Sequence, residues 1–296
     1  FPLSQNLNLI ILLISSYIII KNRNVYFDKN YLLFVFCSSL IISILIIESN
    51  TYRPDAGLYH LPYTSILNHE KIIFGISNLH FRFGHISIMQ YYSAISNNIL
   101  FGLNGIVFAN AIIASSVIIN FLFLLYKKID EKNFDIQFYF IFAIFIFISY
   151  KLNRYSNYGN DAPAHFLLYF LISKLLATEK TFDFNKITNT FLLSVFIFMN
   201  KITLSIVLLA PLFFLKKGII NKLLKNIKTY FTFIFLFLWI CKNIITSGCL
   251  IYPVTETCFK KLSWTDVETA KYIASENEAW AKNWPDSDLN LNHNDY

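Results

Sequence analysis

The sequence is poor in charge. Charged residues make up 15% of the 296 positions, whereas a soluble domain carries about 25%, and hydrophobic residues make up 55%. Several runs of Ile, Leu and Phe reach or approach the ~20 residues that a helix needs to cross a bilayer. This composition excludes an ordinary soluble domain and predicts a polytopic membrane protein.

The sequence also lacks the short motifs of several enzyme classes. It contains no Walker loop, dinucleotide fingerprint, GxSxG elbow or HExxH helix, which disfavours ATP-driven enzymes and the common hydrolases. Four cysteines are too few for a disulfide framework, although Cys249 and Cys258 can close one bridge in an oxidising periplasm. No cofactor is expected, and the alternative is a divalent cation held by His60, His80 and His85.

Charge is unevenly distributed along the chain. From residue 262 to 296, seven acids stand against two lysines, so the preceding part carries a net charge of +12. In a membrane protein, such a basic excess is typical of cytoplasmic loops and of sites for anionic ligands. It therefore does not predict nucleic-acid binding.

The apolar runs predict membrane spans with a fixed orientation, because basic residues cluster at alternate connections and mark these as cytoplasmic. One long run, 187–215, has basic flanks at both ends and a polar break at Asn200 and Lys201. We interpret it as two short helices that turn at Lys201, and the stretch 86–103 as an interfacial or partly inserted helix. The other predicted spans lie near 6–21, 31–47, 104–126, 134–150, 163–177 and 229–246.

Three segments share the outer face on this layout: 48–85, 151–162 and the part from 247 onward. All six histidines lie on or next to these segments, five of them at the first two, and none lies in a cytoplasmic loop. Because histidines and acids gather there, we expect the chemistry at the outer face.

The end of the chain reads as a soluble helix, in which Thr265 and Glu268 form a capping box. We predict a transmembrane domain over residues 1–262 and an acidic helical tail over 263–296 on the outer face. Since the chain opens on Phe1, directly into an apolar run and without a signal-peptide pattern, we expect a fragment of a longer protein.

The first outer segment carries YRPDAGLYHLPY, which gathers Arg53, Asp55 and His60. A carboxylate near the bilayer edge, surrounded by cations, stays ionised and can accept a proton from a substrate hydroxyl. Arginine and histidine nearby can hold a phosphate leaving group. The alternative is a solvated loop in which Asp55 caps a short helix that starts at Ala56.

The second outer segment carries a similar pattern, NDAPAHF. Asp161 and His165 share one face if a helix begins here, although Asp161 can equally be an N-cap with Pro163 in the first turn. Lys201 lies at the break in the membrane hairpin, where a charge faces either a cavity with an anionic partner or the surface by snorkelling.

The order of these features resembles the integral-membrane glycosyltransferases of the GT-C superfold, which include protein mannosyltransferase-like and aminoarabinose transferase-like enzymes. DAGLYHLP is similar to the D-A-x-x-Y-H-L-P signature of a bacterial polytopic family often called LIC_10190-type membrane proteins. The segment GNDAPAHF and the Tyr252-Pro253 turn are also similar to segments of that family. The resemblance implies an all-α bundle of about eight spans. It also implies inverting transfer of a sugar from a polyprenyl-phosphate donor to a lipid, glycan or protein acceptor, on the outer face of the bacterial inner membrane.

By this resemblance, Asp55 is the catalytic base and Asp161 the second acid. A transporter or flippase of lipid-linked glycans would carry acids within the spans and paired inverted repeats, and the sequence has neither. A polymerase or ligase of lipid-linked glycans and an inactive scaffold remain as alternatives. The candidate substrate-binding residues are Arg53, Tyr59, His60, Arg82, His85, His165, Lys201 and Tyr252.

Overall fold

The chain is helical, as the sequence predicts. The computed structural model describes residues 2–3, 5–21, 29–49, 53–85, 87–97, 101–177, 184–214, 223 and 225–283, and within these ranges it contains helices and no strand. Two compact units result: residues 1–70 with 87–232, and residues 71–86 with 233–296. Each unit is described by itself.

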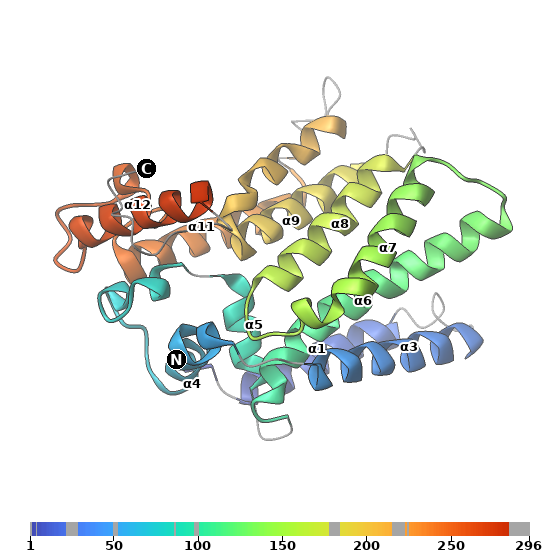
Figure 1. Ribbon diagram of the computed structural model, residues 1–296, viewed down its shortest axis with the longest axis horizontal. Helices are drawn as coiled ribbons and strands as arrows, with labels where there is room; N and C mark the ends of the chain where they lie inside the picture. Colours follow the sequence, from blue (N-terminus) through green and yellow to red (C-terminus); the bar gives the residue numbers. More distant parts are fainter. Residues whose placement is uncertain are drawn as a thin grey trace. The chain divides into compact units, whose positions relative to one another are not determined.

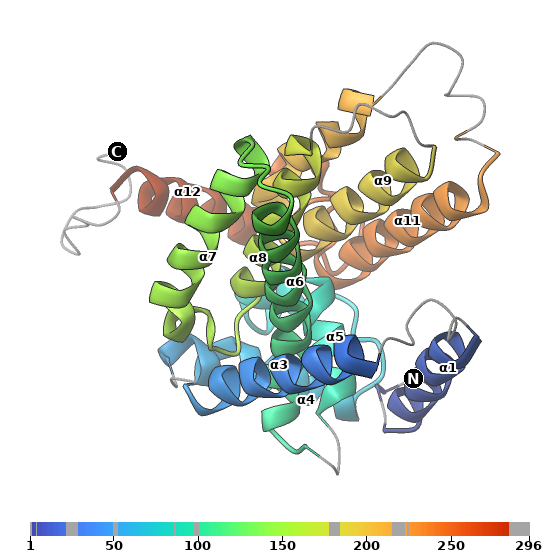
Figure 2. The same cartoon turned by 90° about the vertical axis from the view of Figure 1, so that its right-hand side faces the viewer.

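The first unit is a bundle in which α6, α7 and α8 lie side by side (Figures 1 and 2). Each predicted span coincides with a helix, and α5 covers half of the predicted interfacial stretch 86–103. The helices are α1 (Gln5–Lys21), α3 (Lys29–Glu48), η1 (Ala56–His60), α4 (Leu61–His69), α5 (Ile88–Ser96), α6 (Asn104–Asp130), α7 (Ile136–Tyr155), α8 (Asp161–Leu176), α9 (Phe184–Asn200), η4 (Ile202–Phe214) and the start of α11 (Ile227–Ser247).

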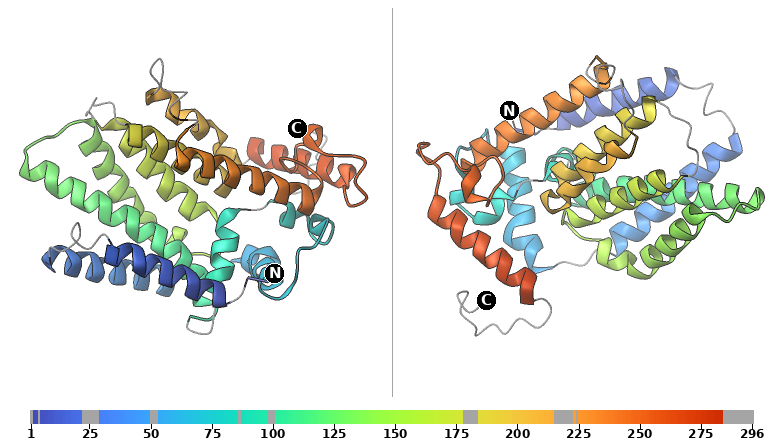
Figure 3. Two further views of the ribbon diagram at one scale, coloured as in Figure 1. Left: turned by 180° about the vertical axis from the view of Figure 1, so that it is seen from behind. Right: turned by 90° about the horizontal axis from the view of Figure 1, so that it is seen from above.

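The hairpin predicted at Lys201 is confirmed. Helix α9 ends at Asn200, and the 3-10 helix η4 begins at Ile202 and packs back along α9 (Figure 3, gold). The polar pair Asn200-Lys201 interrupts an otherwise continuous apolar run. The chain turns there because a continuous helix would bury both polar side chains among apolar ones.

The centre of the first unit is α6, which packs against α3, α5, α7 and α8. Its inner face carries small residues: Ala111 and Ala114 are 0% and 1% exposed. Small side chains let neighbouring helices approach closely, and the larger Phe121 and Phe166 fill the space between these contacts.

Apolar side chains also cover the outside of the helices. On α1, Leu13 is 71% exposed, and on α11 Phe237 is 63% exposed. Within the described residues, two helices are long and apolar enough to cross a membrane, Asn104–Asp130 and Ile227–Ser247. Shorter apolar helices cover Leu9–Ile18, Leu32–Glu48, Ile136–Leu152 and Ile202–Phe214, so the expectation of about eight spans stays a prediction.

The second unit packs residues 71–86, which form the 3-10 turns η2 (Ile76–Asn78) and η3 (Phe81–Gly84), against the loop that follows α11. The Gly75 amide donates to the Ile245 carbonyl at 2.9 Å, and Asn78 Nδ2 donates to the Trp264 carbonyl at 2.9 Å. Cys249 and Cys258, whose pairing the sequence left open, form a disulfide. Helix α12 (Val267–Asn283) packs against this loop, with Ala270 and Ile273 buried in one cluster with Cys249 and Tyr252.

The cap of α12 differs from the prediction. Asp266 caps the helix by accepting from the Thr269 amide at 2.9 Å and from its hydroxyl at 2.6 Å, which holds the pKa of Asp266 below its usual value. The Thr265 side chain is packed against Gly248 and is not available for the predicted capping box. The predicted boundary at residue 262 separates the transmembrane domain from the tail outside the membrane. This boundary stays a prediction.

Candidate functional site

The loop between α7 and α8 is held rigidly at one end of the first unit. Asn110, near the start of α6, donates through Nδ2 to the carbonyls of Asn157 at 3.0 Å and Gly159 at 3.1 Å. The Ser156 hydroxyl donates to the Ile46 carbonyl near the end of α3. Because both anchors are buried, the loop presents Asp161 in a fixed place.

The first acidic motif lies beside this loop. Residues Ala56–His60 form a π-helical turn, closed by a bond from the Leu61 amide to the Ala56 carbonyl, and π turns often occur at functional sites. The turn directs His60 toward Gly159, where an added Cβ would come within 3.3 Å of His60 Nε2. The two acidic segments predicted to form one site are therefore in contact through His60.

Asp55 comes directly before the π turn. As the alternative predicts, its side chain is exposed and it holds the N-cap position of a turn that starts at Ala56, but it makes no side-chain capping hydrogen bond to that turn. Tyr59 lies on the same turn, with its ring centroid 4.2 Å from that of His60. An exposed carboxylate without a structural bond is available to a substrate hydroxyl.

Asp161 pairs with Lys201. The ammonium of Lys201 lies 2.7 Å from Asp161 Oδ1, with side-chain exposures of 29% for the lysine and 66% for the aspartate. Helix α8 begins at Asp161 itself, and the preceding Asn160 provides no side-chain cap, so the N-cap alternative for Asp161 is wrong. The structure thus brings together two of the predicted site residues from segments 40 positions apart.

The turn of the α9–η4 hairpin is fixed from its other side. Asn200 is buried and accepts through Oδ1 from the Ser87 hydroxyl at 2.5 Å. Ser87 is the N-cap of α5, where it forms a capping box with Gln90. This contact places the neighbouring Lys201 at the same end of the unit as Asp161.

His165 lies one turn after Asp161 on α8, as predicted. Its half-buried ring makes an edge contact with Tyr155, at 5.9 Å between centroids, and a tilted contact with Tyr169 at 6.5 Å. The hydroxyls of these two tyrosines lie 3.2 Å apart. An aromatic frame therefore fixes the imidazole beside the Asp161–Lys201 pair.

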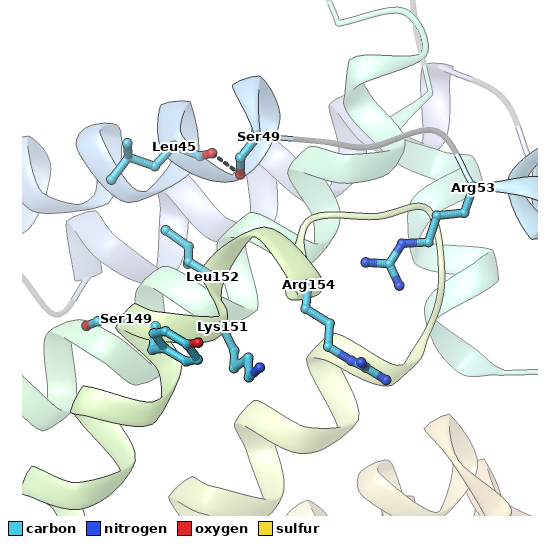
Figure 4. A pocket seen from close by; sticks show the side chains of 8 residues that line it. Leu45, Ser49, Arg53, Ser149, Lys151, Leu152 and Arg154 are labelled. Atoms are coloured by element: carbon cyan, nitrogen blue, oxygen red, sulfur yellow. Dashed lines mark hydrogen bonds between the residues drawn. The ribbon is translucent and has the colours of Figure 1, made fainter. Parts of the chain in front are cut away.

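A cationic pocket of about 580 Å³ opens at this end of the unit. Arg53 reaches into it from the segment before the π turn, and Lys151 and Arg154 come from the last turns of α7 (Figure 4). The lining contains no acid among the described residues. The full lining is Leu45, Ser49, Arg53, Ser149, Tyr150, Lys151, Leu152 and Arg154.

Three predicted site residues lie in the second unit. The His85 ring meets Tyr252 edge to face at 5.3 Å, and Gly84 lies so close to Tyr252 that an added Cβ would come within 2.6 Å of its ring. Within the described part of the chain, His85 Nε2 and the Tyr252 hydroxyl are buried without a hydrogen-bond partner. The Arg82 guanidinium lies 5.1 Å from the Phe81 ring centroid.

The alternative metal site is not assembled within the described residues. No group of three or more His, Cys, Asp or Glu side chains lies close enough there to hold a metal ion. His60 belongs to the first unit, whereas His80 and His85 belong to the second.

Stability of the second unit is expected to fall in mild acid. Burial, with repulsion from Arg82, lowers the pKa of His85 from 6.5 to about 4. The folded state therefore binds fewer protons than the unfolded state between these values, so stability is complete above pH 6.5 and decreases as the pH falls toward 4. The loss reaches about 3 kcal/mol at pH 4.

Denaturant unfolding at several pH values, followed by tryptophan emission, measures this loss, since all four tryptophans lie within residues 233–296. His85→Gln should remove this component of the pH dependence, whereas the matched variant His69→Gln, at an exposed position, should retain it. An equal pH dependence in wild type and His85→Gln would contradict the assignment.

Sequence reasoning found the acids but missed part of their surroundings. Lys151 and Arg154 were given no role, although their spacing of three residues at the end of an apolar helix places them on one face. Ser87, Asn110 and Asn200 were also missed as anchors. Asn110 was the detectable signal, because an amide inside an apolar span needs a hydrogen-bond partner.

Comparison with known proteins places this architecture in a family without assigning its chemistry. No curated protein and no solved structure matches the chain. One family matches residues 1–294, nearly the whole length, and therefore covers both units and every candidate site residue. The chain belongs to the family described as Domain of unknown function (DUF8201).

Proposed function

We propose that this protein is a membrane glycosyltransferase of GT-C type that uses a polyprenyl-phosphate-linked sugar. The acceptor is a lipid, glycan or protein at the outer face of the bacterial inner membrane, in synthesis of envelope polysaccharide or glycolipid. The observation that carries the proposal is the cationic pocket beside the DAGLYHLP turn. Arg53 lines this pocket, and the exposed Asp55 follows two residues later.

The pocket suits a phosphate leaving group. Arg53, Lys151 and Arg154 supply positive charge without a competing acid in the described lining, and guanidinium groups bind phosphate oxygens in pairs. The exposed apolar side chains around the bundle suit a surrounding bilayer that delivers a polyprenyl chain. The disulfide after α11 favours an oxidising outer compartment for that loop.

The reaction is a single displacement with inversion. The acceptor hydroxyl attacks the anomeric carbon while Asp55 takes its proton, and the bond from that carbon to the phosphate oxygen breaks. The leaving phosphate keeps the electron pair and is stabilised by the cations of the pocket. In this scheme Lys201, oriented by Asp161, contacts the donor.

Binding of polyprenyl phosphate by the purified chain tests the proposal. In detergent, this lipid should bind more tightly to wild type than to the double variant Arg53→Gln, Arg154→Gln by about a hundredfold, as expected for two charged hydrogen bonds. The matched control replaces Lys260 and Lys261, in the exposed loop before α12, by Gln. Equal affinity in wild type and the arginine variant would overturn the proposal.

A further inference from the structure

A second pocket lies at the opposite end of the first unit. It has a volume of about 850 Å³, within the usual range for ligand sites, and opens between the ends of α6, α8 and α9. Lys174 lines it, thirteen residues after Asp161 on α8, which places it ~20 Å from the candidate site along the helix axis. The pocket is therefore separate from the site proposed for sugar transfer.

The pocket has a cationic rim and an apolar interior. Four lysines line it, with Glu131 as the one acid among the lining residues that the structure describes. The ammonium of Lys174 lies 5.0 Å from the Phe170 ring centroid, which holds it at the edge of the apolar wall. The apolar wall consists of Ile113, Leu124, Leu167, Phe170, Leu171, Leu192, Leu193, Phe196 and Phe214, and the lysines are Lys127, Lys128, Lys174 and Lys186.

The rim is built by internal contacts. Lys128 is 8% exposed and bonds Asp135 at 2.7 Å, which ties the end of α6 to the start of α7. The buried Gln137 donates through Nε2 to the Ser173 carbonyl at 2.8 Å, which ties α7 to α8. Lysines that served only to mark a helix end would extend into water, whereas these border a hollow whose walls come from α6, α7, α8, α9 and η4.

The cationic rim and the apolar interior of this pocket together indicate the class of ligand that it binds. The lysine ammonium groups match a phosphate, and the Leu and Phe walls match hydrocarbon, so a free phosphate would leave most of the lining unused. Basic pockets between apolar helices bind anionic lipid head groups in membranes. We infer that this pocket binds an anionic phospholipid, with its phosphate at Lys174 and Lys186 and an acyl chain along Phe170 and Phe196.

Native mass spectrometry of the full chain in detergent tests the inference, with phosphatidylglycerol as probe and phosphatidylcholine as the neutral comparison. Phosphatidylglycerol should bind more tightly than phosphatidylcholine. The double variant Lys174→Gln, Lys186→Gln should lose about thirtyfold in phosphatidylglycerol affinity, as expected for two lysine contacts. The matched variant Lys260→Gln, Lys261→Gln should keep the wild-type affinity.

Several results would overturn the inference. One is equal affinity for the two lipids, and another is an equal loss of phosphatidylglycerol affinity in both double variants. A third is full displacement of the lipid by millimolar inorganic phosphate, which would assign the pocket to the phosphate alone. If the pocket variant does not fold, the single Lys174→Gln is measured, with about a fivefold loss expected. Unchanged affinity in that variant would equally reject the assignment. Since Arg53 and Arg154 lie at the other end, these outcomes are independent of the sugar-transfer proposal.

Discussion

Asp55→Asn is expected to abolish sugar transfer, with a loss of about 10²–10⁴-fold in turnover, the usual contribution of a general base. The amide has nearly the same shape as the carboxylate but cannot accept the acceptor proton. The side chain is exposed and makes no capping bond, so the substitution should leave the fold and membrane insertion unchanged. Transfer from a panel of polyprenyl-phosphate hexose and pentose donors in proteoliposomes measures the effect.

The matched control for this variant is Glu70→Gln, at an exposed carboxylate directly after α4. It removes one negative charge from the same outer segment and should retain full transfer. Asp55→Asn should also bind polyprenyl phosphate as tightly as wild type, because the cations of the pocket are intact. Retained transfer in Asp55→Asn would exclude Asp55 as the base.

Lys201→Gln is expected to lower kcat/KM for transfer by about ten- to hundredfold, since one charged hydrogen bond to the donor is worth about 1.5–3 kcal/mol. Asp161→Asn should cost less, because in this scheme Asp161 acts by orienting Lys201. The double variant should then be no worse than Lys201→Gln alone. A double-mutant cycle on kcat/KM, with unfolding midpoints for all three variants, measures this coupling.

The cycle distinguishes two roles for Asp161. Losses that multiply in the double variant would assign it an independent part in the chemistry, as the second acid inferred from the resemblance. The pair is partly exposed to solvent, so its contribution to stability is expected to be at most about 1 kcal/mol. Unfolding midpoints should therefore stay close to wild type, and a large shift would show that the activity loss reflects damage to the fold.

Much of the fold could be predicted because hydrophobic length and flanking charge are local properties. The helix positions follow from the apolar runs, and the turn at Lys201 follows from a run with basic residues at both ends. The pairing of Lys201 with Asp161 could not be predicted in the same way. It depends on the relative register of α8 and α9, which no property of either segment alone encodes.

The same limit explains the incorrect cap of α12. Thr265 and Asp266 are both good caps by residue type, and the sequence pattern favoured Thr265 because Glu268 completes a box. The choice is made by packing, since Gly248, with a φ of 77°, brings the backbone after α11 against the Thr265 side chain. Asp266 then remains as the side chain that can turn toward the helix.

The hydrogen bond between Ser87 and Asn200 has a consequence for synthesis of the protein. The two residues are 113 positions apart, so α5 emerges from the ribosome long before its partner in the hairpin turn. At ~5–20 residues per second, this interval lasts on the order of 6–20 s. Asp161 is made 40 residues before Lys201, so the Asp161 loop exists without Lys201 only for the last ~2–8 s of this interval. The nascent chain therefore completes its candidate site only after α9 has been made, and translation stalled between Asp161 and Lys201 would leave a chain that has both acids but lacks the cation that pairs with Asp161.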